Sequence, residues 1–215
     1  MKQDAMDLSR HWNSVYASRD EARLTWFEDM PEMSLALVRQ HLPPHGALID
    51  VGGGASRLVD LVLDEEPGAI SVLDLSAEAL AITQARLGAR ASQVDFIVAD
   101  LCAWTPDRTY DVWHDRAVFH FLTDPDDQQR YLDRLDKSLR PGGVAVIATF
   151  DLTGPDRCSN LPVQRYSPET LAAKMERLIP GRLVPVHALR HAHQTPGGHI
   201  QNLQISVFRK LETHS

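Results

Sequence analysis

The chain has 215 residues, of which 43% are hydrophobic, and a formal net charge of −7 at pH 7. This length and apolar content suit one well-filled domain, and the acidic balance disfavours nucleic-acid partners, which need a basic surface. No apolar run approaches the roughly 20 residues of a membrane span, and the polar N-terminus lacks the apolar core of a secretory signal, so we expect a cytoplasmic protein without a membrane partner.

Residues 7–40 precede the first predicted strand and indicate two helical segments, the second beginning at Pro31, a residue that suits a first helical turn. Two short aromatic runs, over 11–16 and 24–27, fall in this N-terminal segment. Trp26 in the second run is a candidate for closing over a bound cofactor and excluding water. Packing of these aromatic rings onto the sheet is an equal alternative.

The most informative segment is a predicted strand over 47–51 that turns through Gly52, Gly53 and Gly54 into a helix reaching about residue 64. Glycines leave no Cβ between the main chain and a ligand, so a nucleoside-type cofactor can lie against this turn. The dinucleotide pattern G-x-G-x-x-G is not met, because Arg57 stands at its third glycine and Asp50 precedes the glycines. A nicotinamide oxidoreductase is therefore disfavoured.

Two further predicted strands, over 69–74 and 94–99, also end at acids, Asp74 and Asp100. Open α/β sheets bind ligands at the carboxyl ends of their strands, and an acid about 20 residues after a glycine turn suits the hydroxyls of a ribose. Asp74 is the ribose candidate. The neighbouring Leu75, Ser76 and Leu101 are expected at the same edge.

The rest of the chain continues the alternation of strands and helices. A fourth strand is predicted over 111–115, a helix over 126–139, a Pro-Gly-Gly turn at 141–143 and a fifth strand over 144–148. A helix capped by Ser167 follows, and strands over 183–190 and 200–209 flank the turn sequence 195–198. This pattern predicts an α/β fold with a mostly parallel sheet, helices on both faces and an antiparallel C-terminal hairpin.

These motifs, namely the acid two residues before the glycines, the acids ending the next two strands and the L-R-P-G-G run at 139–143, resemble class I S-adenosylmethionine-dependent methyltransferases. The resemblance covers most of the chain and implies a seven-stranded Rossmann-like sheet with S-adenosyl-L-methionine as cofactor. It implies that Asp50 helps hold the methionine end and that Asp100 receives the adenine amino group. Ser56 replaces a third glycine. We expect one methyltransferase domain over 1–215, with a helical cap over 1–43 and a cofactor-binding core over 44–215.

Methyl transfer from a sulfonium is an in-line displacement, so the protein mainly aligns the reacting atoms and excludes water. The segment after the fourth strand holds the catalytic candidates His114, Asp115 and His120. Arg116 is a substrate-binding candidate, with structural pairing to Asp115 as its alternative. A packed histidine is an equal alternative for His120.

Arg165 and Tyr166, in the loop after the fifth strand, are further candidates for binding a substrate, with fixing of the loop as the alternative. The D-R-x-x-F-H pattern at 115–120, with the aromatic cap, resembles bacterial enzymes near the thiopurine, thiol and chalcogen methyltransferases. It is also similar to small lysine methyltransferases with an aromatic cap. We therefore expect methyl transfer to a small-molecule acceptor, with a thiol or other soft nucleophile favoured. A protein lysine acceptor is the alternative, and a non-catalytic cofactor-binding protein is the third hypothesis.

No metal site is expected. Four histidines at 187, 191, 193 and 199 fall on the predicted hairpin, which we expect to be remote from the methyl site. The cysteines Cys102 and Cys158 lie far apart without C-x-x-C spacing, so reduced thiols are expected rather than a disulfide framework.

Overall fold

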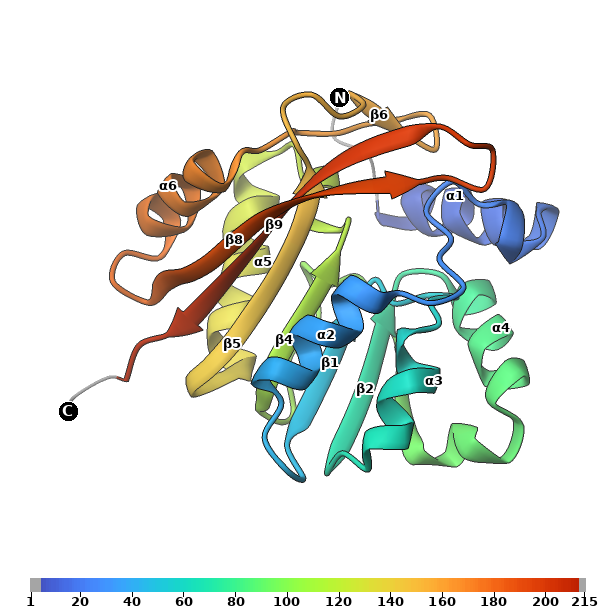
Figure 1. The fold of residues 1–215 in the computed structure, drawn as a ribbon, viewed down its shortest axis with the longest axis horizontal. Coiled ribbons are helices and arrows are strands. Elements are labelled where there is room, and N and C mark those ends of the chain that lie inside the picture. Colours follow the sequence, from blue (N-terminus) through green and yellow to red (C-terminus); the bar gives the residue numbers. More distant parts are fainter. Residues whose placement is uncertain (1–4, 213–215) are drawn as a thin grey trace.

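A seven-stranded sheet in the order β3-β2-β1-β4-β5-β9-β8 organises the chain (Figure 1). The structure is a computed structural model that describes residues 5–212; the outermost residues of the predicted cap and core, 1–4 and 213–215, lie outside the described residues. The first five strands pair in parallel, and β9 runs antiparallel to both β5 and β8. The strands are β1 Ala47–Val51, β2 Ala69–Asp74, β3 Val94–Val98, β4 Tyr110–Arg116, β5 Leu139–Phe150, β8 Leu183–Gln194 and β9 Ile200–Lys210. The predicted fold class is confirmed.

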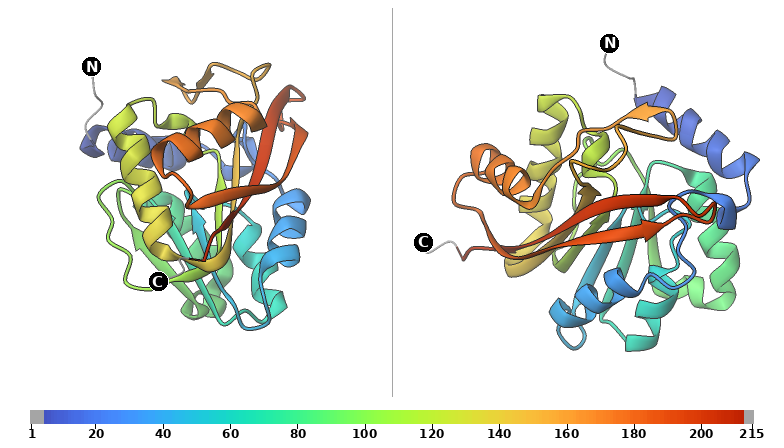
Figure 2. Two further views of the ribbon diagram at one scale, coloured as in Figure 1. Left: turned by 90° about the vertical axis from the view of Figure 1, so that its left-hand side faces the viewer. Right: turned by 45° about the horizontal axis from the view of Figure 1, so that its top comes forward.

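Helices cover both faces of this sheet (Figure 2). The α-helices are α1 Ala5–Ser18, α2 Glu32–His41, α3 Leu58–Val62, α4 Ala77–Leu87, α5 Pro125–Ser138 and α6 Pro168–Leu178. Short 3-10 helices occur at η1 Glu21–Arg23, η2 Leu63–Glu65, η3 Gly88–Gln93 and η4 Phe119–Phe121, and a small hairpin at β6 Arg157–Cys158 and β7 Leu161–Pro162. Apolar residues of α2, α3 and α4 pack on one face, and those of α5 and α6 on the other.

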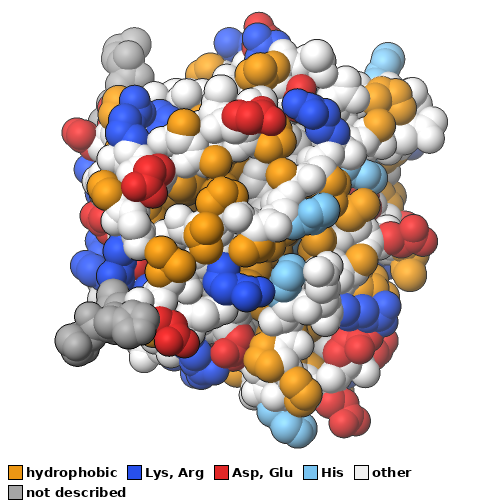
Figure 3. Space-filling model, turned by 60° about the vertical axis from the view of Figure 1, so that its left-hand side comes forward, with side chains coloured by type: hydrophobic (Ala, Val, Ile, Leu, Met, Phe, Trp, Pro, Cys, Tyr) orange, Lys and Arg blue, Asp and Glu red, His pale blue; other side chains and the backbone are white. Residues whose placement is uncertain are grey.

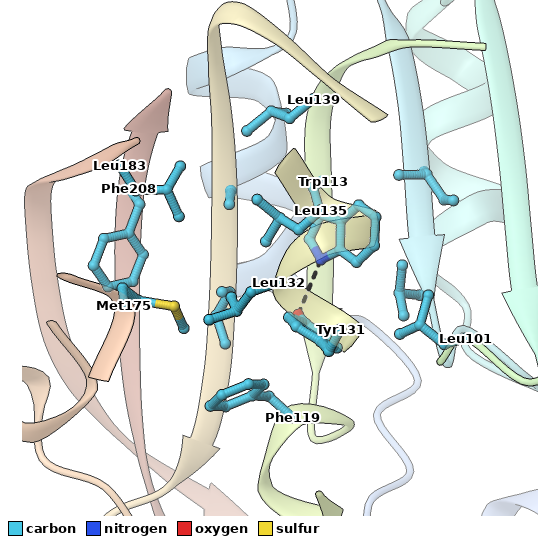
Figure 4. Close-up of a cluster of buried hydrophobic side chains, with 14 of the residues drawn as sticks. Leu101, Trp113, Phe119, Tyr131, Leu132, Leu135, Leu139, Met175, Leu183 and Phe208 are labelled. Atoms are coloured by element: carbon cyan, nitrogen blue, oxygen red, sulfur yellow. Dashed lines mark hydrogen bonds between the residues drawn. The ribbon is translucent and has the colours of Figure 1, made fainter. Parts of the chain in front are cut away.

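The core beneath α5 and α6 is built around large aromatic side chains (Figure 4). Trp113 is fully buried, and its indole Nε1–H donates a 3.0 Å hydrogen bond to the hydroxyl of Tyr131 on α5. A buried indole needs such a partner, because an unpaired N–H in an apolar core costs free energy. This bond fixes α5 over β4, the strand that leads to the site described below.

Side chains that cap the helices explain where several of them begin. Ser76 accepts a hydrogen bond from the Ala79 N–H at the start of α4, and Asp124 does the same for the Asp126 N–H at α5. Ser167 and Thr170 form a reciprocal capping box at α6. Because these caps end loops at the carboxyl edge of the sheet, they also fix the loops that surround the site.

Several predicted boundaries differ from the structure. Residues 141–143, predicted as a turn, belong to β5, which begins at Leu139, where the predicted helix ends; Leu139 is buried and pairs with Tyr110 ahead of a register shift. After Arg116 the chain turns sharply at Ala117, which has a φ of +73°, and only the short η4 follows before α5.

The surface carries charges of both signs. Figure 3 shows Lys and Arg side chains interspersed with Asp and Glu side chains on one face, with hydrophobic side chains between them. None of the helices described within residues 5–212 has the length and apolar character needed to cross a membrane.

Candidate functional site

A cavity of about 730 Å³ opens at the carboxyl edge of the parallel strands. One end of it is lined by the ends of β1, β2 and β3. The other end, which we call the hairpin chamber, lies on the opposite half of the sheet and is formed by the N-terminal segment, the ends of β4 and β5, the β6–β7 hairpin and the tip of the β8–β9 hairpin. The residues of the hairpin chamber are Trp12, Trp26, Arg116, Phe121, Phe150, Cys158, Leu161, His193, Gln201 and Leu203.

The glycine turn brings bare main chain to the cavity at Gly52. Gly52 has a φ of +66°, and a Cβ added to it would lie 2.0 Å from Cγ2 of Val118. Gly54 has a φ of +44°, and its added Cβ would meet the carboxylate of Asp74 at 2.9 Å and the hydroxyl of Tyr16 at 3.0 Å. Only glycine fits both positions, so the predicted turn is enforced by its surroundings as well as by its backbone. Gly53 packs on Asp50 instead of lining the large cavity.

Asp74 and Asp100 lie at the β2 and β3 ends of the cavity, with Leu75 and Leu101 beside them. The Asp74 carboxylate accepts a 2.7 Å hydrogen bond from the Ser76 N–H. Burial, and secondarily the neighbouring Asp50, raise its pKa to about 7, despite that hydrogen bond.

The Asp100 carboxylate accepts a 2.9 Å bond from the Cys102 N–H. Of the residues predicted at this edge, Ser76 does not line the cavity. Its hydroxyl caps α4 and donates to Asn13 of α1 instead, at 2.8 Å. Two carboxylates therefore face the cavity from neighbouring strand ends, as the sequence predicted.

Asp50 lies under the glycine turn and lines a smaller pocket of about 60 Å³. This pocket shares Gly52, Trp26 and Arg116 with the large cavity, so the two spaces adjoin. Oδ1 of Asp50 lies 2.7 Å from Nδ1 of His114. A carboxylate fixed by this contact closes the floor of the small pocket.

Aromatic rings of the N-terminal segment roof the cavity. The Trp12 ring makes edge contacts with Trp26 at 5.8 Å and with Phe121 at 5.2 Å between centroids, and Tyr16 contacts Trp26 at 6.1 Å. Burial raises the pKa of Tyr16 far above its ordinary value, so its hydroxyl stays protonated. Asn13 ties α1 to α4 by accepting from the Ser76 hydroxyl. The rings thus pack against one another and also line the cavity. Both interpretations of Trp26, as a packing residue and as a wall of the cofactor site, are compatible with this position.

The three predicted catalytic side chains do not line the large cavity, although His114 borders the small pocket beside Asp50. His114 is enclosed between β4 and α2, with its Nδ1 facing Asp50 and its Nε2 3.0 Å from the hydroxyl of Ser34. Asp115 points to the opposite face of the sheet, because successive side chains on a strand alternate. A histidine and an acid adjacent on β4 are therefore kept apart by the sheet itself.

Asp115 is fully buried and its carboxylate is saturated by hydrogen bonds. It accepts from the Tyr131 hydroxyl at 2.6 Å, the Val118 N–H at 2.8 Å and the Phe119 N–H at 3.0 Å. Burial raises its pKa to about 6 against the opposing effect of these bonds. The geometry gives Asp115 the role of holding the turn between β4 and η4.

His120 is also fully buried, between the rings of Phe121 and Phe150. Its Nδ1 accepts a 3.2 Å bond from the Phe150 N–H, and burial lowers its pKa to about 3. The imidazole is therefore neutral at ordinary pH, with its proton on Nε2. It supports two rings of the hairpin chamber from behind.

Of the three residues predicted to bind the substrate, only one lines the large cavity. Arg116 lines the cavity and pairs with Glu28 rather than with Asp115, at 2.9 Å. Arg165 and Tyr166 do not line it: Arg165 donates to the carbonyl of Gly154 at 3.1 Å, and Tyr166 is buried, 3.3 Å from Nε2 of Gln128. Both contacts are with groups of the protein, which agrees with the alternative that Arg165 and Tyr166 fix the loop.

The C-terminal hairpin corrects another expectation. It is not remote from the site, because β8 continues past the predicted end at Arg190 to Gln194 and carries His193 into the chamber wall. Gln201 and Leu203 of β9 line the same wall and were not predicted. The only sequence signal for them was the strand pattern itself, since the wall that they share with Trp12 and Trp26 joins segments far apart in the sequence. Among the described residues, no group of three or more His, Cys, Asp or Glu side chains is arranged to hold a metal ion.

Several known proteins that are similar to this chain are methyltransferases. A family model described as a methyltransferase domain matches residues 49–145. A trans-aconitate 2-methyltransferase of Methylobacterium radiotolerans is 32% identical over 140 residues, which cover 65% of this chain and 50% of that protein. A malonyl-[acyl-carrier protein] O-methyltransferase of Ilyobacter polytropus is 26% identical over 104 residues, covering 48% and 39%. The chain thus matches half or less of the length of these relatives.

Solved structures show the same fold. The 1,6-didemethyltoxoflavin-N1-methyltransferase of Burkholderia thailandensis, bound to S-adenosylhomocysteine, superposes with a TM-score of 0.75 at 21% identity and covers 99% of this chain and 92% of that one. The N-methyltransferase NodS of Bradyrhizobium japonicum, also with S-adenosylhomocysteine, gives 0.67 at 17% identity, covering 93% and 100%.

The chain shares the fold of these solved methyltransferases, and its residues 49–145 match a methyltransferase domain. The cofactor that this match implies is S-adenosylmethionine. The residues present fit this group, because Gly52 offers main chain without a Cβ and Asp74 and Asp100 offer carboxylates at neighbouring strand ends.

Proposed function

We propose that the whole chain transfers a methyl group from S-adenosylmethionine to a small-molecule acceptor. The observation that carries this proposal is the continuity of one cavity, which runs from the acids at the β2 and β3 ends to the hairpin chamber. In this proposal the cap, residues 1–43, closes over the cofactor that the core, residues 44–215, binds. A cavity lined beyond the cofactor residues leaves room for a second molecule.

The wall residues suggest how the cofactor is held. Asp74 would accept hydrogen bonds from the ribose hydroxyls, and Asp100 with Leu101 would receive the adenine. The main chain at Gly52 would lie against the nucleoside, and the pocket over Asp50 would hold the methionine end. Trp26 borders both spaces, where the methionine end and the reacting atoms would meet.

The chamber supports a nucleophile that needs little help from a base. A bound sulfonium cofactor supplies an activated methyl group, so this chain's residues orient the acceptor and exclude water. Asp115 and His120 are enclosed, and both ring nitrogens of His193 contact protein oxygens. We therefore assign His114, Asp115 and His120 to support of the site. A thiol or other soft nucleophile of low pKa, which loses its proton readily, suits such a wall.

Titration calorimetry with S-adenosylmethionine and S-adenosylhomocysteine tests the proposal, with NAD as the control ligand. We expect both sulfur nucleosides to bind and NAD not to bind. Absence of binding by either nucleoside would overturn the proposal.

Transfer itself is then measured with methyl-labelled cofactor and a panel of small molecules beginning with thiols. A parallel incubation uses proteins from a lysate of cells lacking this chain. Label in a thiol supports the proposal, whereas label found only in protein lysine would establish the lysine alternative. Tight nucleoside binding without transfer to any acceptor would favour the non-catalytic hypothesis.

A further inference from the structure

The one arginine among the described residues lining the large cavity is already neutralised. Arg116, at the end of β4, places Nη2 2.9 Å from Oε1 of Glu28, and its Nη1 donates a 2.9 Å hydrogen bond to the carbonyl of Trp26. Both carry little exposure, 18% for the side chain of Arg116 and 19% for that of Glu28. An incoming anion would meet a guanidinium whose charge is already paired with Glu28, and it would meet the charge of Glu28 beside it.

The second basic side chain of the chamber is occupied in the same way. Nδ1 of His193 lies 3.0 Å from Oε1 of Glu28, and Nε2 lies 2.8 Å from the carbonyl of Thr25, with the residue only 3% exposed. Because each ring nitrogen faces a protein oxygen, neither is left to donate to a ligand. His191 approaches the same carboxylate at 3.9 Å.

Glu28 thus joins the N-terminal segment, the end of β4 and the tip of the β8–β9 hairpin. Burial raises the pKa of Glu28, but the hydrogen bond from His193 and the charge of Arg116 outweigh burial, so that its pKa is lowered overall. Its carboxylate is charged at neutral pH and stays available to pair with Arg116. The charges of this cluster are satisfied within the protein.

The remaining wall of the hairpin chamber is mostly apolar and aromatic, with rings from Trp12, Trp26, Phe121 and Phe150 and the aliphatic Leu203. Aromatic walls bind flat rings by stacking and edge contacts, and they offer nothing to replace the hydration of a carboxylate or phosphate. Gln201 adds a neutral amide, which can donate to or accept from an uncharged polar group.

We propose that the hairpin chamber selects an acceptor with a flat aromatic frame that carries no carboxylate or phosphate, and that Glu28 sets this selectivity by neutralising Arg116 and binding His193. This inference rests on the proposed function, in which the chamber holds the methyl acceptor. The selectivity concerns the frame of the acceptor and not its nucleophilic atom. A negative charge on that atom would face the positive sulfonium of the cofactor.

Two probes of nearly the same shape test this proposal, 2-naphthamide, which is neutral, and 2-naphthoate, which is an anion. Their binding is measured by calorimetry with and without S-adenosylhomocysteine, and trans-aconitate, with three carboxylates, serves as a non-aromatic anion. We expect the amide to bind at least about tenfold more tightly than the naphthoate, and trans-aconitate to bind weakest, because a desolvated anion without a free partner loses more than 1.4 kcal/mol.

A Glu28→Gln variant should release Arg116 and raise the affinity for 2-naphthoate by about tenfold while leaving that for 2-naphthamide unchanged. The matched control is Asp29→Asn, which removes the same charge from the next residue, whose side chain is 77% exposed; it should change neither affinity. Wild-type protein that binds S-adenosylhomocysteine but prefers 2-naphthoate or trans-aconitate to the amide, or binds no aromatic probe, would overturn this inference and leave the proposed function standing. Failure to bind S-adenosylhomocysteine would overturn the proposed function alone, since the probes are also measured without it.

Discussion

Asp74 is placed to make cofactor affinity depend on pH. With a pKa of about 7, its side chain is mostly protonated at pH 6 and mostly ionised at pH 8. Only the carboxylate accepts hydrogen bonds from both hydroxyls of a ribose. We therefore predict that the affinity for S-adenosylhomocysteine, measured by calorimetry, falls by up to about tenfold from pH 8 to pH 6. An Asp74→Asn variant should bind more weakly and lose most of this pH dependence; an unchanged slope in the variant would assign the titration to another group.

The same residue should have the opposite effect on stability. Its pKa is raised from an ordinary value of 3.8, so the folded protein holds this proton more tightly than the unfolded chain does. The stabilising contribution is full below about pH 4 and is lost as the pH rises through about 7. Asp74→Asn should accordingly raise the unfolding temperature of the ligand-free protein at pH 8, by about 3 °C or more. A lower unfolding temperature of the variant at pH 8 would contradict the interpretation that the ionised, buried Asp74 destabilises the folded protein.

Two substitutions of Asp115 distinguish a structural role of this residue from a catalytic role. Asp115→Ala leaves the Tyr131 hydroxyl and two backbone N–H groups without their acceptor, so we expect the free energy of unfolding to fall by about 3 kcal/mol or more. Asp115→Asn should cost less, because its carbonyl oxygen still accepts. Both variants, kept well below their unfolding temperatures, should bind S-adenosylhomocysteine within about twofold of the wild type. Unchanged stability with abolished methyl transfer would return Asp115 to the catalytic role.

At the scale of elements, α1 is held over the cavity by few polar contacts. Asn13 accepts from the Ser76 hydroxyl at 2.8 Å and from the Glu78 N–H at 3.3 Å, which ties α1 to the start of α4. Asn13→Ala should speed hydrogen exchange in α1 and weaken S-adenosylhomocysteine binding several-fold, because Trp12 and Tyr16 of α1 line the cavity. The control is Asp7→Ala, which removes only an exposed contact with Arg10 on the same helix. Equal effects of the two substitutions would argue against this tie.

The tip of the β8–β9 hairpin is a second closing element, fixed by His193. His193→Ala removes the contacts with Glu28 and Thr25, so exchange should accelerate in residues 190–202 while β5 and the inner part of β9 stay protected. His199→Ala, an exposed histidine of the same hairpin, is the matched control and should leave exchange unchanged. Uniform acceleration throughout the sheet in His193→Ala would indicate general destabilisation instead.

At the scale of the molecule, the half of the site on β1 to β3 was predictable, whereas only Trp26 and Arg116 of the hairpin chamber were candidates from the sequence. Asp74 ends the buried strand β2 and Asp100 follows the edge strand β3, and topology alone brings the carboxyl ends of parallel neighbours to one edge. Local sequence therefore sufficed for the candidate cofactor residues. Asp50 also ends a strand, but it faces the smaller pocket beneath the turn.

The hairpin chamber depends on contacts that no local pattern encodes. Whether His114 or Asp115 points at a ligand depends on which face of β4 each occupies and on what packs there, namely Ser34 of α2 and Tyr131 of α5. Only Arg116, the last residue of the strand, reaches the cavity. His193 meets Glu28 across 165 positions of sequence, which required the length and twist of the hairpin to be known.

The N-terminal segment, the parallel strands and the C-terminal hairpin share one cavity, so a ligand there should stabilise them as a unit. A ligand that binds only the folded state at 100 times its dissociation constant adds about 2.7 kcal/mol, which for a domain of this length raises the unfolding temperature by about 5–10 °C. We predict a single calorimetric transition that moves upward with S-adenosylhomocysteine concentration and does not move with NAD. Cap, core and hairpin all contribute wall residues, so none should melt separately from the others. Two transitions, of which only one responds to the nucleoside, would show that the segments forming the hairpin chamber fold independently of the half that holds the cofactor.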